Sequence, residues 1–111
     1  MLQTLVMVTD LKDDDALIAQ YEEYHRNVWP EIVLGIKNIG VIGMDIYRAG
    51  NRLVMLMTVP QDFDFSAQMA TLASMPMQNE WENLMWKYQQ ALPFAKEDEK
   101  WVMTKIIFKL S

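Results

Sequence analysis

At 111 residues the chain has the length of a single domain with a substantial core, and without cysteine it forms no disulfide framework, zinc–thiolate site or cysteine nucleophile. Its net charge of −5 and its scattered lysines and arginines argue against nucleic acid and anionic membrane as partners. With no signal peptide and no apolar run near the ~20 residues of a membrane span, we expect one cytoplasmic domain spanning residues 1–111.

The N-terminal third of the chain predicts a strand followed by two helical segments. Residues 4–9 are short, β-branched and apolar, as in a strand. The acidic run 13–15 supplies an N-cap and first-turn negative charge for a helix. Pro30 is unfavourable for a continuous helix but favoured in the first turn of a new one. We therefore expect a kink near Asn27, with the second helical piece over residues 31–38.

The remainder predicts a β-hairpin, two helices and a last strand. Alternating residues indicate strands over 41–48 and 52–59 around a tight turn. The order βαββαβ is the α+β, ferredoxin-like plan, an antiparallel sheet with helices on one face. The other expected elements are a helix from Ser66 as its cap to Ser74, a helix over 78–92 ended by Pro93, a solvated charged loop over 96–100, and a strand over 101–110.

The predicted sheet is apolar on both faces. Leu53 and Met55 point one way while Val54 and Leu56 point the other, and Ile107 lies opposite its neighbours in the last strand. A sheet of this kind does not leave one face in water without a large exposed apolar patch. Because the helices cover only one face, we predict a twofold homodimer through the other.

The only histidine, His25, is four residues after Tyr21, so both lie on one inward face of a helix. Such a histidine is either a core residue hydrogen-bonded to a neighbour or a proton-transfer group in a pocket. Flat rings with a polar handle, beside carboxylates, suit a sugar. The aromatic residues of the helical segments are Tyr21, Tyr24, Trp29, Trp81, Trp86 and Tyr88, and the nearby glutamates, most of them expected on solvated faces, are Glu22, Glu23, Glu31, Glu80 and Glu82.

Several other kinds of site lack their sequence patterns. One histidine without cysteine is a poor basis for a transition-metal site, which gathers several such ligands. There is no glycine-rich phosphate loop, and the acidic run at 13–15 is not followed by EF-hand spacing. The sequence thus offers only a weak basis for a metal site and no phosphate-binding motif.

The run from Tyr21 through His25 to Trp29-Pro30-Glu31 resembles the signature of the L-rhamnose mutarotase family. Its Trp-Pro-Glu part is the most specific, and the resemblance covers nearly the whole chain. Other segments also resemble the family in their order and spacing. They are Gly40 with the strand through Ile46-Tyr47, Asn51-Arg52-Leu53, Trp81 with Met85, and the closing strand through Phe108.

The resemblance implies a dimeric ferredoxin-like α+β barrel that interconverts the α and β anomers of a 6-deoxy sugar without cofactor or metal. It places the catalytic histidine at His25, a substrate-contacting tyrosine at Tyr21 and a sugar-packing tryptophan at Trp81. Two positions depart from the rhamnose enzymes, which have a second tryptophan at Glu82 and a sugar-contacting tyrosine at Met44. Because sites built on hydroxyl contacts discriminate strongly between sugars, both L-rhamnose and L-fucose are candidate substrates.

Mutarotation requires a proton to leave the anomeric hydroxyl while another reaches the ring oxygen. An imidazole serves in either direction near neutral pH, so we assign His25 as the main acid/base. Tyr21 would orient the sugar or relay a proton, Trp81 would pack against the ring, and Glu82 would bind a hydroxyl or act as the partner base. Two alternatives remain open: a cofactor-free monooxygenase or haem-degrading enzyme with His25 as base or axial ligand, and a non-catalytic sugar-binding dimer with the aromatic residues as core.

Overall fold

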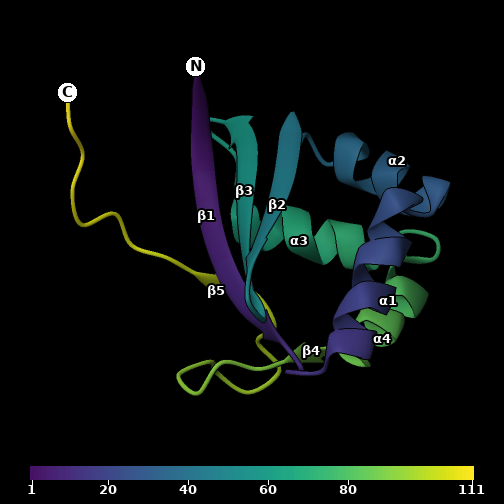
Figure 1. Cartoon of the computed structure of the whole chain (residues 1–111). Helices are drawn as coiled ribbons and strands as arrows, with labels where there is room; N and C mark the ends of the chain where they lie inside the picture. Colours follow the sequence, from purple (N-terminus) through teal and green to yellow (C-terminus); the bar gives the residue numbers. More distant parts are fainter.

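A twisted antiparallel sheet carries four helices on one of its faces (Figure 1) in the computed structural model, which describes residues 1–111. None of the four helices has the length and apolar character needed to cross a membrane. The elements in chain order are β1 (Leu2–Leu11), α1 (Asp15–Arg26), α2 (Pro30–Asn38), β2 (Gly43–Ala49), β3 (Arg52–Pro60), α3 (Phe65–Ala73), α4 (Gln78–Trp86), β4 (Gln89–Gln90) and β5 (Val102–Met103).

The sheet has the predicted ferredoxin-like order, with a fourth strand that is broken in two. Strands run in the order β2-β3-β1, and the free edge of β1 pairs with β4 near one end and β5 further along. The register of β1 against β3 runs from Leu2 opposite Pro60 to Asp10 opposite Arg52. The hairpin between β2 and β3 turns at Gly50, whose φ of +60° lies in the left-handed region that glycine adopts easily. The predicted α+β plan is therefore confirmed.

The predicted helix over 78–92 is too long. Helix α4 ends at Trp86, and two residues later Gln89 pairs with Leu11 of β1. Tyr88 lies on the same helical face as the buried residues of α4 and is itself buried, so helical spacing does not reveal the break. The helix ends because the backbone at this point bonds to the chain after β1: the Lys12 amide donates to the Tyr88 carbonyl at 2.8 Å.

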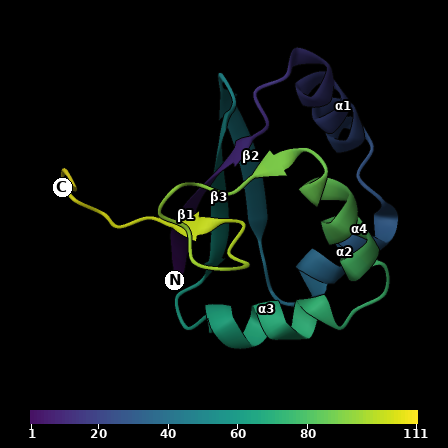
Figure 2. The same ribbon diagram turned by 90° about the horizontal axis from the view of Figure 1, so that it is seen from below.

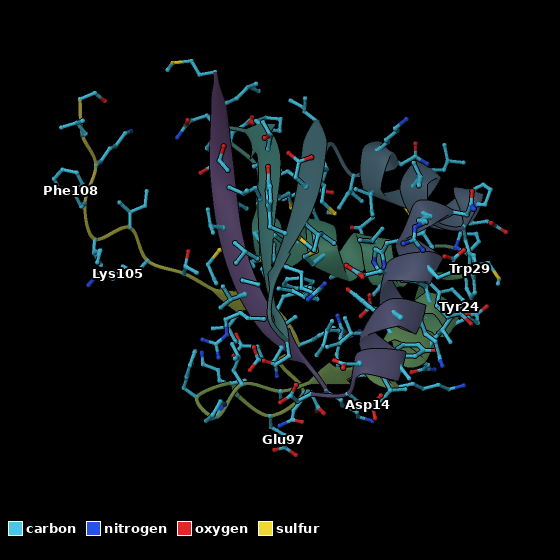
Figure 3. All side chains as sticks on the ribbon, in the orientation of Figure 1. Asp14, Tyr24, Trp29, Glu97, Lys105 and Phe108 are labelled. Carbon is cyan, nitrogen blue, oxygen red and sulfur yellow. The ribbon has the colours of Figure 1, made fainter.

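The predicted strand over 101–110 is mostly wrong. Only Val102 and Met103 form β5, and Thr104 adds a backbone hydrogen bond to Val6 at 3.0 Å. Beyond it, residues 105–111 extend away from the body on the side opposite the helices in both ribbon views (Figures 1 and 2). Figure 3 shows Lys105 and Phe108 standing clear of the rest of the chain. Alternating apolar residues mark a strand only where a neighbouring strand is available to pair, and this chain by itself provides none here.

Asp side chains cap the N-termini of α1 and α3. Asp14 accepts a hydrogen bond from the Leu17 amide at 3.0 Å, within the predicted acidic run. Asp64, rather than the predicted Ser66, caps α3 by accepting from the Ala67 amide at 3.1 Å. Both residue types are favoured caps, and the aspartate stands one residue before the observed helix start.

The core lies between the helices and the sheet. On β3 the predicted inward residues are buried and the alternate residues are half-buried. Helices α2 and α4 approach closely at Gly35, where a Cβ would lie 2.4 Å from the Gln78 side-chain nitrogen. The two buried clusters are Leu11, Ile18, Tyr21, Ile32, Leu53, Trp81, Met85 and Tyr88, and Met7, Ile39, Val41, Met55, Met57 and Val59.

No helix covers the opposite face of the sheet (Figures 1 and 2). Its apolar residues include Val6 and Val8 on β1 and Val54 and Leu56 on β3, all half-buried in the single chain. The sheet is thus apolar on both faces, as predicted.

Candidate active site

A cavity of about 780 Å³ lies between the sheet and the helices, and its walls are mostly apolar. A volume of this size is in the range of small-molecule sites. The structure brings all five predicted site residues to its lining: Tyr21, His25, Met44, Trp81 and Glu82. They come from α1, β2 and α4, so residues separated by up to 61 positions in the chain meet around one space.

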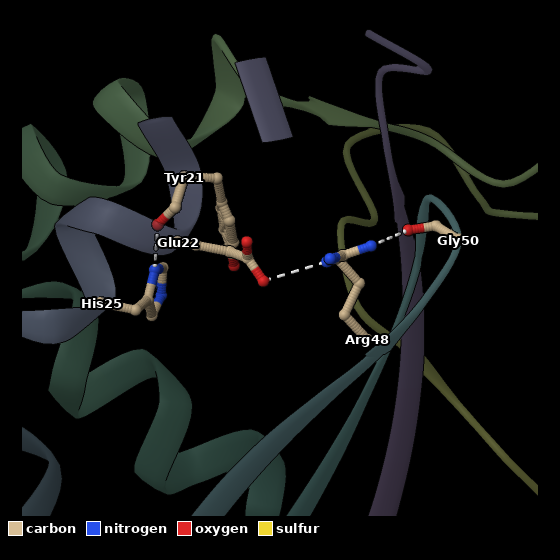
Figure 4. Close-up of polar contacts among 5 residues, drawn as sticks. All are labelled: Tyr21, Glu22, His25, Arg48 and Gly50. Atoms are coloured by element: carbon tan, nitrogen blue, oxygen red, sulfur yellow. Dashed lines mark hydrogen bonds and ion pairs between the residues drawn. The ribbon is translucent and has the colours of Figure 1, made fainter. Parts of the chain in front are cut away.

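Helix α1 aims Tyr21 and His25 into this cavity from consecutive turns. The His25 Nδ1 lies 2.8 Å from the Tyr21 backbone oxygen (Figure 4). Because a carbonyl only accepts, Nδ1 carries the hydrogen and Nε2 is the unprotonated nitrogen of the neutral ring. The two rings lie 4.2 Å apart between centroids. On the exposed side of the same helix, Glu22 pairs with Arg48 at 3.0 Å and ties α1 to the β2–β3 hairpin.

Burial favours the neutral form of both His25 and Tyr21 at neutral pH. Burial lowers the pKa of His25 below its ordinary value of 6.5, and the hydrogen bond to the Tyr21 carbonyl only partly opposes this shift. Burial also raises the pKa of Tyr21 well above its ordinary value of 10.0, an effect that the Gln89 hydrogen bond reduces and the charge of Glu82 increases. The site therefore holds a neutral imidazole beside a phenol that keeps its proton.

Trp81 forms the aromatic wall of the cavity. Its ring centroid lies 5.6 Å from that of His25 and 5.1 Å from that of Trp29, both edge to face. The six predicted aromatic residues divide into three groups: Tyr21 and Trp81 line the cavity, Tyr24, Trp29 and Tyr88 line a shallower groove beside α1, and Trp86 lies under the Lys100 ammonium. Of the five nearby glutamates, only Glu82 lines the cavity.

Lys100 is a site residue that the sequence did not predict. The sequence predicts a solvated loop here, but Lys100 is 8% exposed and lines the cavity. Its ammonium lies 2.7 Å from Glu82 Oε2 and 4.9 Å from the centroid of the Trp86 ring. Burial lowers the pKa of Lys100, and the Glu82 carboxylate opposes that shift. Within the run Lys96-Glu97-Asp98-Glu99-Lys100 nothing distinguishes the last residue from its solvated neighbours, except that Trp101 follows it.

Gln89 is the second site residue that the sequence did not predict. It is buried at the start of β4, lines the cavity, and its Nε2 donates to the Tyr21 hydroxyl oxygen at 3.3 Å. Because this oxygen accepts from Gln89, the hydroxyl proton of Tyr21 is free to be donated elsewhere. The prediction of a helix through Leu92 concealed this role, since Gln89 faces the cavity only because α4 has ended.

Together these groups suit proton transfer on a small, flat, hydroxylated molecule. A neutral imidazole offers a lone pair and a phenol offers a proton, while one carboxylate–ammonium pair adds hydrogen-bonding capacity at the α4 side of the cavity. Apolar and aromatic walls supply a packing surface for a sugar ring.

Comparisons with known proteins agree with this chemistry. The sequence pattern of the L-rhamnose mutarotase family matches residues 4–110. An L-fucose mutarotase of Xanthomonas campestris pv. campestris is 49% identical over 112 residues, which cover 99% of this chain and 90% of that protein. Among solved structures, L-rhamnose mutarotase FA22100 of Formosa agariphila superposes with a TM-score of 0.71 at 20% identity, covering 98% of this chain and 99% of that one.

The fold extends to enzymes of other kinds. Tetracenomycin F2 cyclase of Streptomyces glaucescens superposes with a TM-score of 0.62 at 17% identity, covering 98% of this chain and 97% of that one. At this identity the likeness concerns the fold alone. The sequence relationship is what separates the chain from these enzymes, and by it the chain belongs to the L-rhamnose mutarotase family.

Proposed function

We propose that this protein is a mutarotase that interconverts the α and β anomers of L-fucose. The observation that carries the proposal is the pairing of a neutral His25, whose Nε2 is unprotonated, with a protonated Tyr21 hydroxyl in one aromatic-walled cavity. Anomer exchange needs one group that takes a proton and one that gives a proton. Membership of the mutarotase family supports this reading over the monooxygenase alternative.

The reaction opens and recloses the pyranose ring. His25 Nε2 takes the proton of the anomeric hydroxyl as the C1–O5 bond breaks, and O5 receives a proton from Tyr21 or through it. The product is the open-chain hydroxyaldehyde. Rotation about C1–C2 then presents the other face of the carbonyl to the O5 hydroxyl. As the ring recloses, His25 gives its proton to the anomeric oxygen and the O5 hydroxyl returns its proton to or through Tyr21. The enzyme is therefore regenerated, and the sugar changes only in its anomeric configuration.

The choice of L-fucose rests on Glu82 and Met44. The family resemblance places a tryptophan and a tyrosine of the rhamnose enzymes at these positions, whereas here a carboxylate and a thioether line the cavity. A carboxylate accepts hydrogen bonds from sugar hydroxyls, whereas an aromatic ring only packs against the sugar. The replacement therefore changes which arrangement of hydroxyls the site recognises. The 49% identity to a protein named L-fucose mutarotase supports the same sugar.

Saturation-transfer NMR on the anomeric protons tests the proposal directly. With catalytic amounts of protein, we expect transfer between the α and β signals of L-fucose to exceed that of L-rhamnose at equal concentration. Faster exchange with L-rhamnose would overturn the sugar assignment while keeping the activity. No acceleration with either sugar, in a protein that still binds one of them, would favour the non-catalytic binding dimer.

The lowered pKa of His25 predicts an acidic limb in the pH profile. We expect kcat/KM to hold down to pH 6.5, the ordinary histidine value, and to fall only below it as Nε2 becomes protonated. Because the folded state takes up this proton less readily than the unfolded chain, the free energy of unfolding is unaffected above pH 6.5 and decreases below it. Initial rates and chemical denaturation from pH 5 to 8 check both effects, and a limb centred above 6.5 would contradict them.

We further propose that the protein acts in the cytoplasm as a homodimer. A chain without cysteine suits a reducing compartment. The uncovered sheet face and the apolar tail of residues 105–111 support dimerisation, since both expose apolar side chains that a second copy would bury.

A further inference from the structure

The Lys100–Glu82 pair, whose two residues line the cavity, has unused hydrogen-bonding capacity. The Lys100 ammonium carries three protons, and its two acceptors are both in Glu82: Oε2 at 2.7 Å and the backbone oxygen at 3.2 Å. The Glu82 Oε1 has no hydrogen-bond partner in the chain. One donor and one acceptor therefore remain free within the same ion pair.

The pair is held firmly at its lysine end and open at its glutamate end. The side chain of Lys100 is 7% exposed, whereas that of Glu82 is 54% exposed. The Trp86 ring lies under the ammonium, with its centroid 4.9 Å away. A buried ammonium is costly without a carboxylate partner, and Glu82 supplies that partner at the cavity wall.

A donor and an acceptor held side by side match two neighbouring hydroxyls of a sugar. One hydroxyl donates to the free carboxylate oxygen and the other accepts from the ammonium. Hydrogen bonds to charged groups are the stronger kind, and their alignment depends on whether the two hydroxyls are cis or trans. L-Fucose and L-rhamnose differ in configuration at C2 and C4, so their neighbouring hydroxyl pairs are arranged differently.

We propose that Lys100 is a specificity-determining residue, which binds one of two neighbouring sugar hydroxyls while its partner Glu82 binds the other. This inference rests on the proposed mutarotase function and assigns sugar recognition to a residue outside the α1 and α4 motifs. Lys100 takes no part in the proton transfer, which remains with His25 and Tyr21.

The test compares Lys100→Met with the wild-type protein on both sugars. Methionine keeps the length and apolar stem of the side chain and removes the donors and the charge. For L-fucose we expect KM to rise about ten- to hundredfold, as for loss of a hydrogen bond to a charged group, with a smaller change in kcat. The ratio of kcat/KM for L-fucose to that for L-rhamnose should fall towards one. Lys87→Met, at an exposed lysine just after α4, is the matched control and should leave both sugars unaffected.

A purely structural Lys100 gives a different pattern. Its loss would lower the melting temperature and reduce the rates on both sugars in proportion. An unchanged ratio of kcat/KM for L-fucose to kcat/KM for L-rhamnose therefore overturns the inference. If Lys100→Met does not fold, Lys100→Arg replaces it, because arginine keeps the charge but presents a planar donor group, and the ratio must still change. Wild-type inactivity on both sugars overturns the proposed function and this inference with it. Wild-type activity with an unaltered ratio in the variants overturns this inference alone.

Discussion

Replacing His25 by asparagine should lower the rate of anomer exchange by about 10²–10⁴-fold, the usual contribution of positioned proton transfer. In the wild-type chain His25 Nδ1 lies 2.8 Å from the Tyr21 carbonyl oxygen. The side-chain NH₂ of asparagine is suited to replace Nδ1 as the donor to this oxygen. It has no lone pair basic enough to take the anomeric proton, so the fold is retained and the chemistry is lost. Exchange of the anomeric NMR signals measures the rate, and the melting temperature reports the fold.

Tyr24→Phe is the matched control for that substitution. Tyr24 lies on α1 one residue before His25 but lines the outer groove instead of the cavity. We expect this variant to keep wild-type exchange rates. If His25→Asn exchanged the anomers as fast as wild type while melting at the same temperature, His25 would be a core histidine and the acid/base assignment would be wrong.

Introducing aspartates at Ile106 and Phe108 should convert the proposed dimer to a monomer. These side chains are 73% and 77% exposed in the single chain (Figure 3 labels Phe108). Burial of each in a partner would contribute about 1.5–3 kcal/mol, and burial of an unpaired carboxylate would be strongly unfavourable. The double substitution should therefore weaken dimerisation by at least about 10²–10⁴-fold, which sedimentation velocity over a range of concentrations measures.

Lys105→Asp supplies the control within the same tail. It introduces the same side chain at a residue that is already charged and exposed, so the dimer should persist with at most a small change in affinity. Wild-type protein that sediments as a monomer at all concentrations would refute the dimer. In that case another partner would have to cover the tail and the open sheet face.

The most reliable parts of the sequence interpretation depend on short-range geometry. Tyr21 and His25 share the inner face of α1 because residues four apart on a helix are neighbours. The buried and half-buried alternation along β3 follows from the two-residue period of a strand in the same way. The family resemblance identified Trp81, Glu82 and Met44 as candidate site residues. The structure places all three at the same cavity as His25.

The two errors in element bounds, at the end of α4 and in the last strand, share one cause, which is that the pairing partner lies far away in the chain. Helical spacing continues through Tyr88, but the backbone leaves the helix to bond with the segment after β1. The alternation over residues 106–110 is that of a strand, but the single chain provides no neighbour for it. In both cases the local pattern is the same whether or not the distant partner is present.

The sequence by itself determined the fold class, the family and the inward face that carries His25 and Tyr21, because periodicity and a contiguous motif are local properties. Tertiary structure alone decided that Gln89 reaches the Tyr21 hydroxyl and that Lys100 is buried beside Glu82. A lysine in a charged run looks solvated until the loop carrying it folds back onto α4, and only packing creates that environment.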